Sequence, residues 1–135
     1  MPTITTHSEA ETIAAGRELA SRLAAGSVVL LFGDLGAGKT AFVRGLASGL
    51  GIAPDEVSSP TFTIIRQYGG GRVPLLHVDL YRLAAKEVDD LGLDELGEHA
   101  VVAIEWAERM PRDTAGAVRV TLTHAGDTAR TLTIE

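Results

Sequence analysis

The chain has 135 residues, no cysteine and a formal net charge of −6 at neutral pH. This length suits one domain with a single core, and the lack of cysteine excludes disulfides, thiol catalysis and thiolate metal sites. The apolar fraction of 45% is ordinary for a globular protein and excludes a disordered chain. The negative charge repels a phosphate backbone, so this chain is not expected to provide the main binding surface for a nucleic acid.

The N-terminal residues have neither the basic start nor the apolar stretch of a secretory signal. No apolar run approaches the roughly 20 residues that a helix needs to cross a bilayer. These two observations lead us to expect a cytoplasmic protein that makes no membrane contact.

The first half of the chain predicts a helix, a buried strand, a glycine-rich loop and a second helix. The first helix begins at a capping box formed by Ser8 and Glu11, and Gly26 lies where the helix is expected to end. Residues 28–32 are apolar without alternation, a pattern typical of a strand covered on both faces in a parallel sheet. The loop follows at once, and the second helix is expected over about 39–50.

Strand signals dominate the second half of the chain. β-Branched and aromatic residues favour a strand over 62–68, and 73–80 is another strand candidate. Acids mixed with leucines over 86–99 predict one or two short helices, and 101–104 is a second fully apolar strand. Two alternating segments within 118–134 flank a Gly–Asp turn and predict a C-terminal β-hairpin. Together these elements predict one α/β domain, spanning all 135 residues, with a mainly parallel central sheet.

The loop after the first buried strand matches the full P-loop pattern Gly-x4-Gly-Lys-Thr. Its glycines let backbone amides converge on an anion, and the helix that follows adds partial positive charge. Lys39 supplies a cation for the outer phosphates, and the Thr40 hydroxyl is suited to ligate Mg²⁺. The pattern therefore predicts that a nucleoside triphosphate with magnesium binds at Gly33, Asp34, Leu35, Gly36, Ala37, Gly38, Lys39, Thr40 and Ala41.

Hydrolysis or phosphoryl transfer also needs an acid beside the γ-phosphate, and such acids usually lie at the C-terminal ends of buried strands. Asp79 and Glu105 both have this position in the sequence. Glu105 is the cleaner candidate for a magnesium ligand because only apolar residues lead up to it. The alternative reading makes Asp79 a turn cap and Glu105 the start of an exposed loop.

Two other residues, Thr61 and Trp106, have two readings each. Thr61 lies in a Ser-Ser-Pro-Thr segment that either senses the γ-phosphate or forms an ordinary turn. Trp106 either packs in the core or serves partner recognition. His77 is expected to be structural, because the histidines lack the spacing of a metal site. The predicted catalytic set is Lys39, Thr61, Asp79 and Glu105.

Four motifs follow one another along the chain: the P-loop, Ser59-Pro60-Thr61-Phe62, His77-x-Asp79-Leu80-Tyr81-Arg82 and Ile104-Glu105-Trp106. In this order they resemble the bacterial TsaE family, the ATPase component of tRNA threonylcarbamoyladenosine (t6A) biosynthesis. The resemblance runs from about Ser8 through Arg109. The resemblance implies a three-layer α/β P-loop fold, slow ATP hydrolysis, and assembly with the TsaD and TsaB subunits. It also implies that tRNA is reached indirectly, through that complex.

Residue by residue, the resemblance implies that Lys39 and Thr40 hold phosphate and magnesium, and that Glu105 is a magnesium ligand. Asp79 matches the second functional acid, and Thr61 falls in a switch-like loop. In the family, the adenine lies near the start of the first helix and the C-terminal hairpin.

The alternative from another functional class is a small-molecule P-loop kinase. Such an enzyme usually closes an arginine-bearing lid over the phosphates. Here the arginines are scattered, and no segment between the predicted strands is long enough for a lid domain. A regulatory module that only binds a partner in a nucleotide-dependent way is a third reading.

Overall fold

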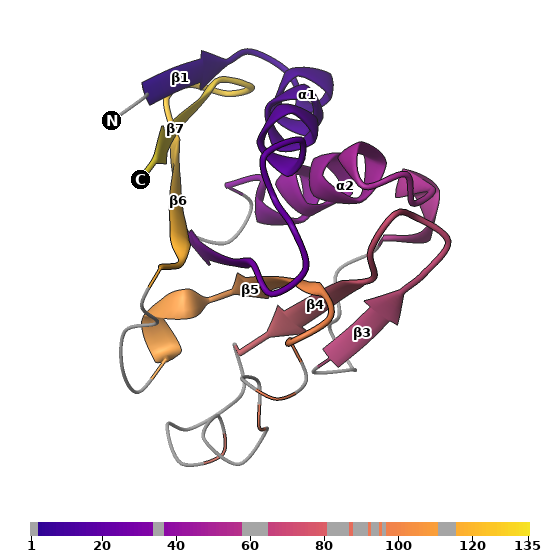
Figure 1. The fold of residues 1–135 in the computed structure, drawn as a ribbon. Helices are drawn as coiled ribbons and strands as arrows, with labels where there is room; N and C mark the ends of the chain where they lie inside the picture. Colours follow the sequence, from indigo (N-terminus) through magenta and orange to yellow (C-terminus); the bar gives the residue numbers. More distant parts are fainter. Residues whose placement is uncertain are drawn as a thin grey trace.

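The structure is a computed structural model that describes residues 3–33, 37–57, 65–80, 87, 92, 95, 97–110 and 116–135. Along the chain its elements are β1 (Thr3–Thr6), α1 (Glu9–Ala20), β2 (Val28–Phe32), α2 (Lys39–Gly49), a 3₁₀ turn (Pro54–Glu56), β3 (Ile65–Tyr68), β4 (Leu75–Asp79), β5 (Val101–Glu105), a second 3₁₀ turn (Ala107–Arg109), β6 (Val118–His124) and β7 (Arg130–Ile134). The strands form one sheet in the order β1-β7-β6-β2-β5-β4-β3 (Figure 1).

The centre of this sheet is parallel and its two margins are antiparallel. β2 pairs in parallel with both β5 and β6, and β5 pairs in parallel with β4. β3 pairs antiparallel with β4, while β7 pairs antiparallel with both β6 and β1. The predicted α/β class, parallel centre and C-terminal hairpin are confirmed. β1 is an element that the sequence pattern does not predict, because it has four residues and three of them are exposed.

Helices α1 and α2 lie side by side on one face of the sheet (Figure 1). Their backbones approach closely where Gly16 of α1 meets Gly45 of α2. A Cβ atom on Gly45 would come within 2.1 Å of the Ile13 carbonyl oxygen and 2.9 Å of the Gly16 Cα atom. Only glycine allows this spacing, which brings α2 firmly against α1 and fixes the helix that follows the phosphate loop.

Both ends of α1 are capped by side chains. The Ser8 hydroxyl accepts a hydrogen bond from the Glu11 amide at 3.1 Å, as the capping box predicts. The Glu11 carboxylate, however, accepts from the His7 amide at 3.0 Å, one residue before the expected partner. At the other end, the Arg72 guanidinium donates to the carbonyls of Ala20 and Leu23 at 2.7 and 2.8 Å. The helix end is thereby tied to the segment between β3 and β4.

The opposite face of the sheet carries a second apolar cluster, with buried side chains from β2, β4 and β5. The helices predicted over 86–99, and with them the third layer, fall mostly on residues outside the described part of the chain. Among the described helices, none combines the length and the apolar character needed to cross a membrane.

Candidate functional site

The phosphate loop begins at the end of β2 and ends at the start of α2. Gly33 has φ 149°, and a Cβ atom there would lie 2.5 Å from the Leu122 carbonyl oxygen. Gly38 has φ 100° and is the N-terminal cap of α2. Both positions need glycine, because side chains rarely adopt this left-handed backbone. The predicted residues Asp34, Leu35 and Gly36 lie outside the described part of the chain.

The start of α2 has the electrostatic character of an anion site. No side chain of the described residues caps the helix, and its first turn contains no acid. The first turn instead contains Lys39, whose positive charge adds to the partial positive charge of the helix terminus. This arrangement is unfavourable on its own, and a bound anion would relieve it.

Lys39 is almost fully buried, with 5% of its surface exposed. Its Nζ atom donates to the Gly33 carbonyl at 2.5 Å and lies 3.5 Å from the centroid of the Trp106 ring. Trp106 is the one non-glycine residue of the described chain with a positive φ, at 60°. This strained backbone turns the chain at the end of β5 and brings the indole ring over the lysine. Trp106 thus contacts Lys39 of the phosphate loop as well as packing against the apolar cluster on the opposite face.

Strand alternation brings the candidate acids to the helix-covered face of the sheet. In β4, Leu75 packs in the cluster beneath α1 and α2, whereas Leu76 and Val78 pack on the opposite face. Side chains two residues apart share a face, so Asp79 lies on the side of the helices. The same alternation places Glu105 on that side, since Ala103 belongs to the helix-covered cluster.

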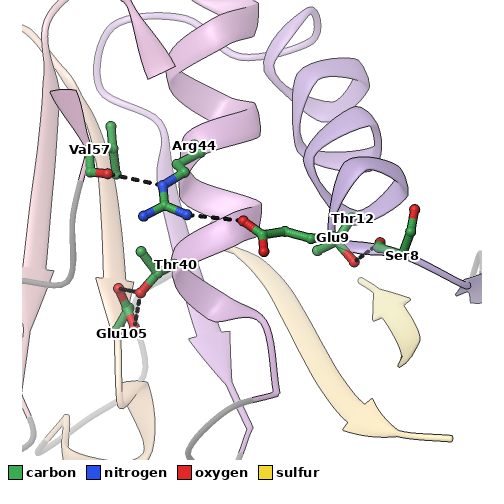
Figure 2. A network of polar contacts seen from close by, with 7 residues as sticks. All are labelled: Ser8, Glu9, Thr12, Thr40, Arg44, Val57 and Glu105. Carbon is green, nitrogen blue, oxygen red and sulfur yellow. Dashed lines mark hydrogen bonds and ion pairs between the residues drawn. The ribbon is translucent and has the colours of Figure 1, made fainter. Parts of the chain in front are cut away.

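Glu105 lies directly beside the first turn of α2 (Figure 2). The Thr40 Oγ1 atom is 3.2 Å from Glu105 Oε2 and 3.5 Å from Oε1, so the hydroxyl donates to the carboxylate. Glu105 is 4% exposed, so the reading of this acid as the start of an exposed loop is wrong. The predicted neighbourhood of Thr40 and Glu105 is therefore present in the structure.

Asp79 is the register partner of Glu105 in the parallel pair of β4 and β5. Paired positions of adjacent strands are about 5 Å apart, so the two acids stand side by side at the same edge of the sheet. Asp79 is partly exposed, whereas Glu105 is buried. The two acids therefore differ in surroundings, with Glu105 held by the phosphate-loop helix and Asp79 closer to solvent.

The pair formed by Thr40 and Glu105 fits the donor chemistry of magnesium. Mg²⁺ prefers hard oxygen ligands and usually takes only one or two from the protein, with phosphate oxygens and waters completing the shell. A hydroxyl and a carboxylate 3.2 Å apart can supply such ligands. Within the described ranges no group of three or more His, Cys, Asp or Glu side chains could hold a metal, so a full protein cage is absent there.

Arg44 lies one turn after Thr40 and links three segments (Figure 2). Its Nε atom donates to the Val57 carbonyl at 3.0 Å, and its Nη1 atom donates to the Glu9 carboxylate at 3.1 Å. Val57 directly precedes the Ser-Ser-Pro-Thr segment, while the predicted site residue Thr61 lies outside the described part of the chain. Arg44 thus fixes Val57 relative to α1 and α2.

The two bonds of Arg44 are expected to differ in strength. Replacing Arg44 with methionine should lower the free energy of unfolding by about 1–2 kcal/mol, because the Val57 carbonyl loses a charged donor. Replacing Glu9 with glutamine should lower it by less than about 1 kcal/mol, because the ion pair is exposed and screened. Urea unfolding of both variants measures the difference, and equal losses would contradict this ranking.

His77 is a site residue whose contact the sequence did not reveal. Its side chain is fully buried, and its Nε2 atom hydrogen-bonds to Glu105 Oε2. The available signal was the position of His77 two residues before Asp79, which places both on one face of the same strand.

Comparisons with known proteins agree with this architecture. The family model described as "Threonylcarbamoyl adenosine biosynthesis protein TsaE" matches residues 6–132. A relative from Nostoc is 48% identical over 124 residues, which cover 88% of this chain and 76% of that protein. A relative from Bacillus subtilis is 44% identical over 128 residues, covering 91% of this chain and 78% of that protein. Both are named "tRNA threonylcarbamoyladenosine biosynthesis protein TsaE".

The solved structure of YdiB from Bacillus subtilis superposes with a TM-score of 0.77 at 36% sequence identity. The match covers 98% of this chain and 83% of that structure. The family match alone spans every described residue of the candidate site. The chain belongs to the TsaE family of threonylcarbamoyl adenosine biosynthesis proteins.

Proposed function

We propose that this chain is the ATP-binding and ATP-hydrolysing subunit required for t6A modification of adenosine 37, in tRNAs that read codons beginning with A. The observation that carries the proposal is the pairing of the Thr40 hydroxyl with the buried Glu105 carboxylate, 3.2 Å apart, at the start of α2. That helix begins with a lysine and without an acid, as an anion site requires. The names of the family and of its relatives supply the link to t6A.

Each residue has a part in the proposed reaction. Backbone amides at the start of α2 receive the phosphates, and Lys39 leaves the Gly33 carbonyl to pair with the outer phosphates. Thr40 and Glu105 would hold Mg²⁺, which supplies charge neutralisation of the β- and γ-phosphate oxygens when bound. Asp79, beside Glu105 in the sheet, orients the attacking water or couples the nucleotide state to a partner. Thr61 is proposed to approach the γ-phosphate from the segment after Val57.

The proposed partners are the TsaD and TsaB subunits, and the proposed place of action is the cytoplasm. The net charge of −6 disfavours tight binding of tRNA by this chain alone, so tRNA is reached through the complex. Reconstitution of t6A formation on tRNA, with this chain, without it and with a hydrolysis-dead variant, tests this role. Modification that proceeds equally without the chain would overturn it. Phosphate release in the absence of an acceptor separates the ATPase from the kinase alternative.

Nucleotide binding is tested by replacing Lys39 with methionine, an unbranched side chain that removes the cation lying over the Trp106 ring. We expect ATP affinity to fall at least about tenfold, because one charge-assisted contact to phosphate is lost. Isothermal titration calorimetry measures the affinity, and circular dichroism verifies the fold. The control is Arg22→Met, which removes the same charge from an exposed position. Unchanged affinity in a folded Lys39 variant would exclude the phosphate-loop assignment.

A further inference from the structure

His77 occupies an unusual place for a histidine. It is the middle residue of β4 and fully buried, in a strand whose neighbouring positions are leucine and valine. Its Nε2 atom bonds to Oε2 of Glu105, the acid that pairs with Asp79 two residues further along the strand. An aliphatic residue would fill this core position without burying a polar ring. Packing alone therefore does not account for an imidazole here.

The hydrogen bonds define which way the imidazole faces. Nδ1 is buried and has no hydrogen-bond partner among the described residues. A proton on Nδ1 would leave a buried donor unsatisfied, whereas a lone pair there is less costly. The network therefore assigns the proton to Nε2, which donates to the Glu105 carboxylate. The polar contact of the ring in the described structure is thus directed at the candidate magnesium ligand.

This bond leaves the two oxygens of Glu105 in different situations. Oε2 accepts from His77 and also from the Thr40 hydroxyl at 3.2 Å. Oε1 lies farther from that hydroxyl, at 3.5 Å, and is the less engaged oxygen. Two donors on one oxygen restrict rotation of the carboxylate about its last bond. The plane of the group is thereby set before any cation arrives, with Oε1 left to receive it.

We propose that His77 is a positioning residue that orients the Glu105 carboxylate for magnesium. The inference rests on the proposed function, because it concerns the same metal site. Groups hydrogen-bonded behind a metal ligand fix its orientation, and their loss commonly costs 10–100-fold in metal affinity. His77 itself touches neither metal nor nucleotide in this scheme.

The test compares two amide replacements of His77 that differ only in reach. In His77→Gln the side-chain amide can extend to the position of Nε2 and donate to Glu105, whereas in His77→Asn it stops near the position of Nδ1. Both variants bury the same polar group, so a merely structural role predicts similar stability losses and similar metal behaviour. The affinity for ADP is measured by calorimetry across a range of Mg²⁺ concentrations, for wild type and both variants.

We expect His77→Asn to need about 10–100-fold more Mg²⁺ to reach half of its gain in ADP affinity. ADP affinity without Mg²⁺ should stay close to wild type, and His77→Gln should recover most of the Mg²⁺ response. Equal Mg²⁺ dependence of all three proteins would overturn the inference while leaving the proposed function in place. An absence of any Mg²⁺ effect in wild type would instead overturn the proposed function and this inference together.

A second readout needs no nucleotide. A buried N–H that donates to a carboxylate is shielded from solvent exchange and shifted far downfield in the proton NMR spectrum. We expect wild type to show one such imidazole resonance, Glu105→Gln to shift it upfield, and His77→Gln to remove it. A wild-type spectrum without this resonance would contradict the bond from which the inference is built.

Discussion

Replacing Glu105 with glutamine is expected to abolish measurable ATP hydrolysis and to weaken the Mg²⁺ dependence of nucleotide binding. The amide keeps the size of the side chain and can still accept from His77 and Thr40, so the fold should survive. It lacks the negative charge that a magnesium ligand provides. Losing a metal-coordinating group in phosphoryl transfer raises the barrier by on the order of several kcal/mol, which lowers the rate by a factor of 100 or more.

Asp79→Asn is the matched comparison, because Asp79 is the register partner of Glu105 at the same edge of the sheet. This variant should still bind Mg·ATP but lose turnover, since Asp79 is proposed to act on water or on a partner. The measurements are Mg²⁺-dependent nucleotide affinity and phosphate release for both variants. Loss of Mg²⁺-dependent binding in Asp79→Asn, with retention in Glu105→Gln, would show that the two roles are reversed. Full hydrolysis in both would remove these acids from the catalytic set.

The second large effect concerns stability, where Gly45→Ala is expected to destabilise the protein by about 1–3 kcal/mol. Helix propensity alone predicts the opposite sign, because alanine is favoured over glycine by roughly 1 kcal/mol inside a helix. The close approach of α1 outweighs this difference in helix propensity. The new Cβ atom would stand 2.1 Å from the Ile13 carbonyl oxygen, and the contact atoms are backbone that cannot rotate away. Helix α2 must therefore move outward.

Urea unfolding measures this loss, with Gly69→Ala as the control. A Cβ atom on Gly69 meets no described atom within 4 Å, so this replacement should leave stability unchanged or slightly raised. Nucleotide affinity should also fall in Gly45→Ala, because α2 begins at the phosphate loop. A Gly45→Ala variant as stable as wild type would contradict the rigid packing of α1 on α2.

Local patterns in the sequence were sufficient for the elements that are buried on both faces and for the loop between them. β2 and residues 101–104 of β5 are continuous apolar runs, and the glycines, lysine and threonine of the phosphate loop have fixed spacing. Glu105 could be predicted as a magnesium ligand because it follows such a run directly. These features depend on neighbouring residues only, so they can be predicted from the sequence without a structure.

The contacts that the sequence did not reveal depend on register between distant strands. His77 meets Glu105 across 28 residues of sequence, and only the parallel pairing of β4 with β5 brings them together. The left-handed backbone of Trp106 is likewise a product of its surroundings, since tryptophan has no preference for it. β1 is short and pairs with the last strand, so no pattern in the neighbouring sequence predicts it.

The position of β2 in the sheet has a consequence for the order of events during synthesis. Both neighbours of β2 come later in the chain, with Leu31 paired to Glu105 and Phe32 paired to Thr121. A growing chain therefore holds the phosphate loop on a strand with two unpaired edges until β5 and β6 have emerged. Non-local parallel pairing of this kind is slow to form, and exposed strand edges invite association with other chains. The nucleotide site, encoded near the start of the chain, is thus among the last parts to be completed.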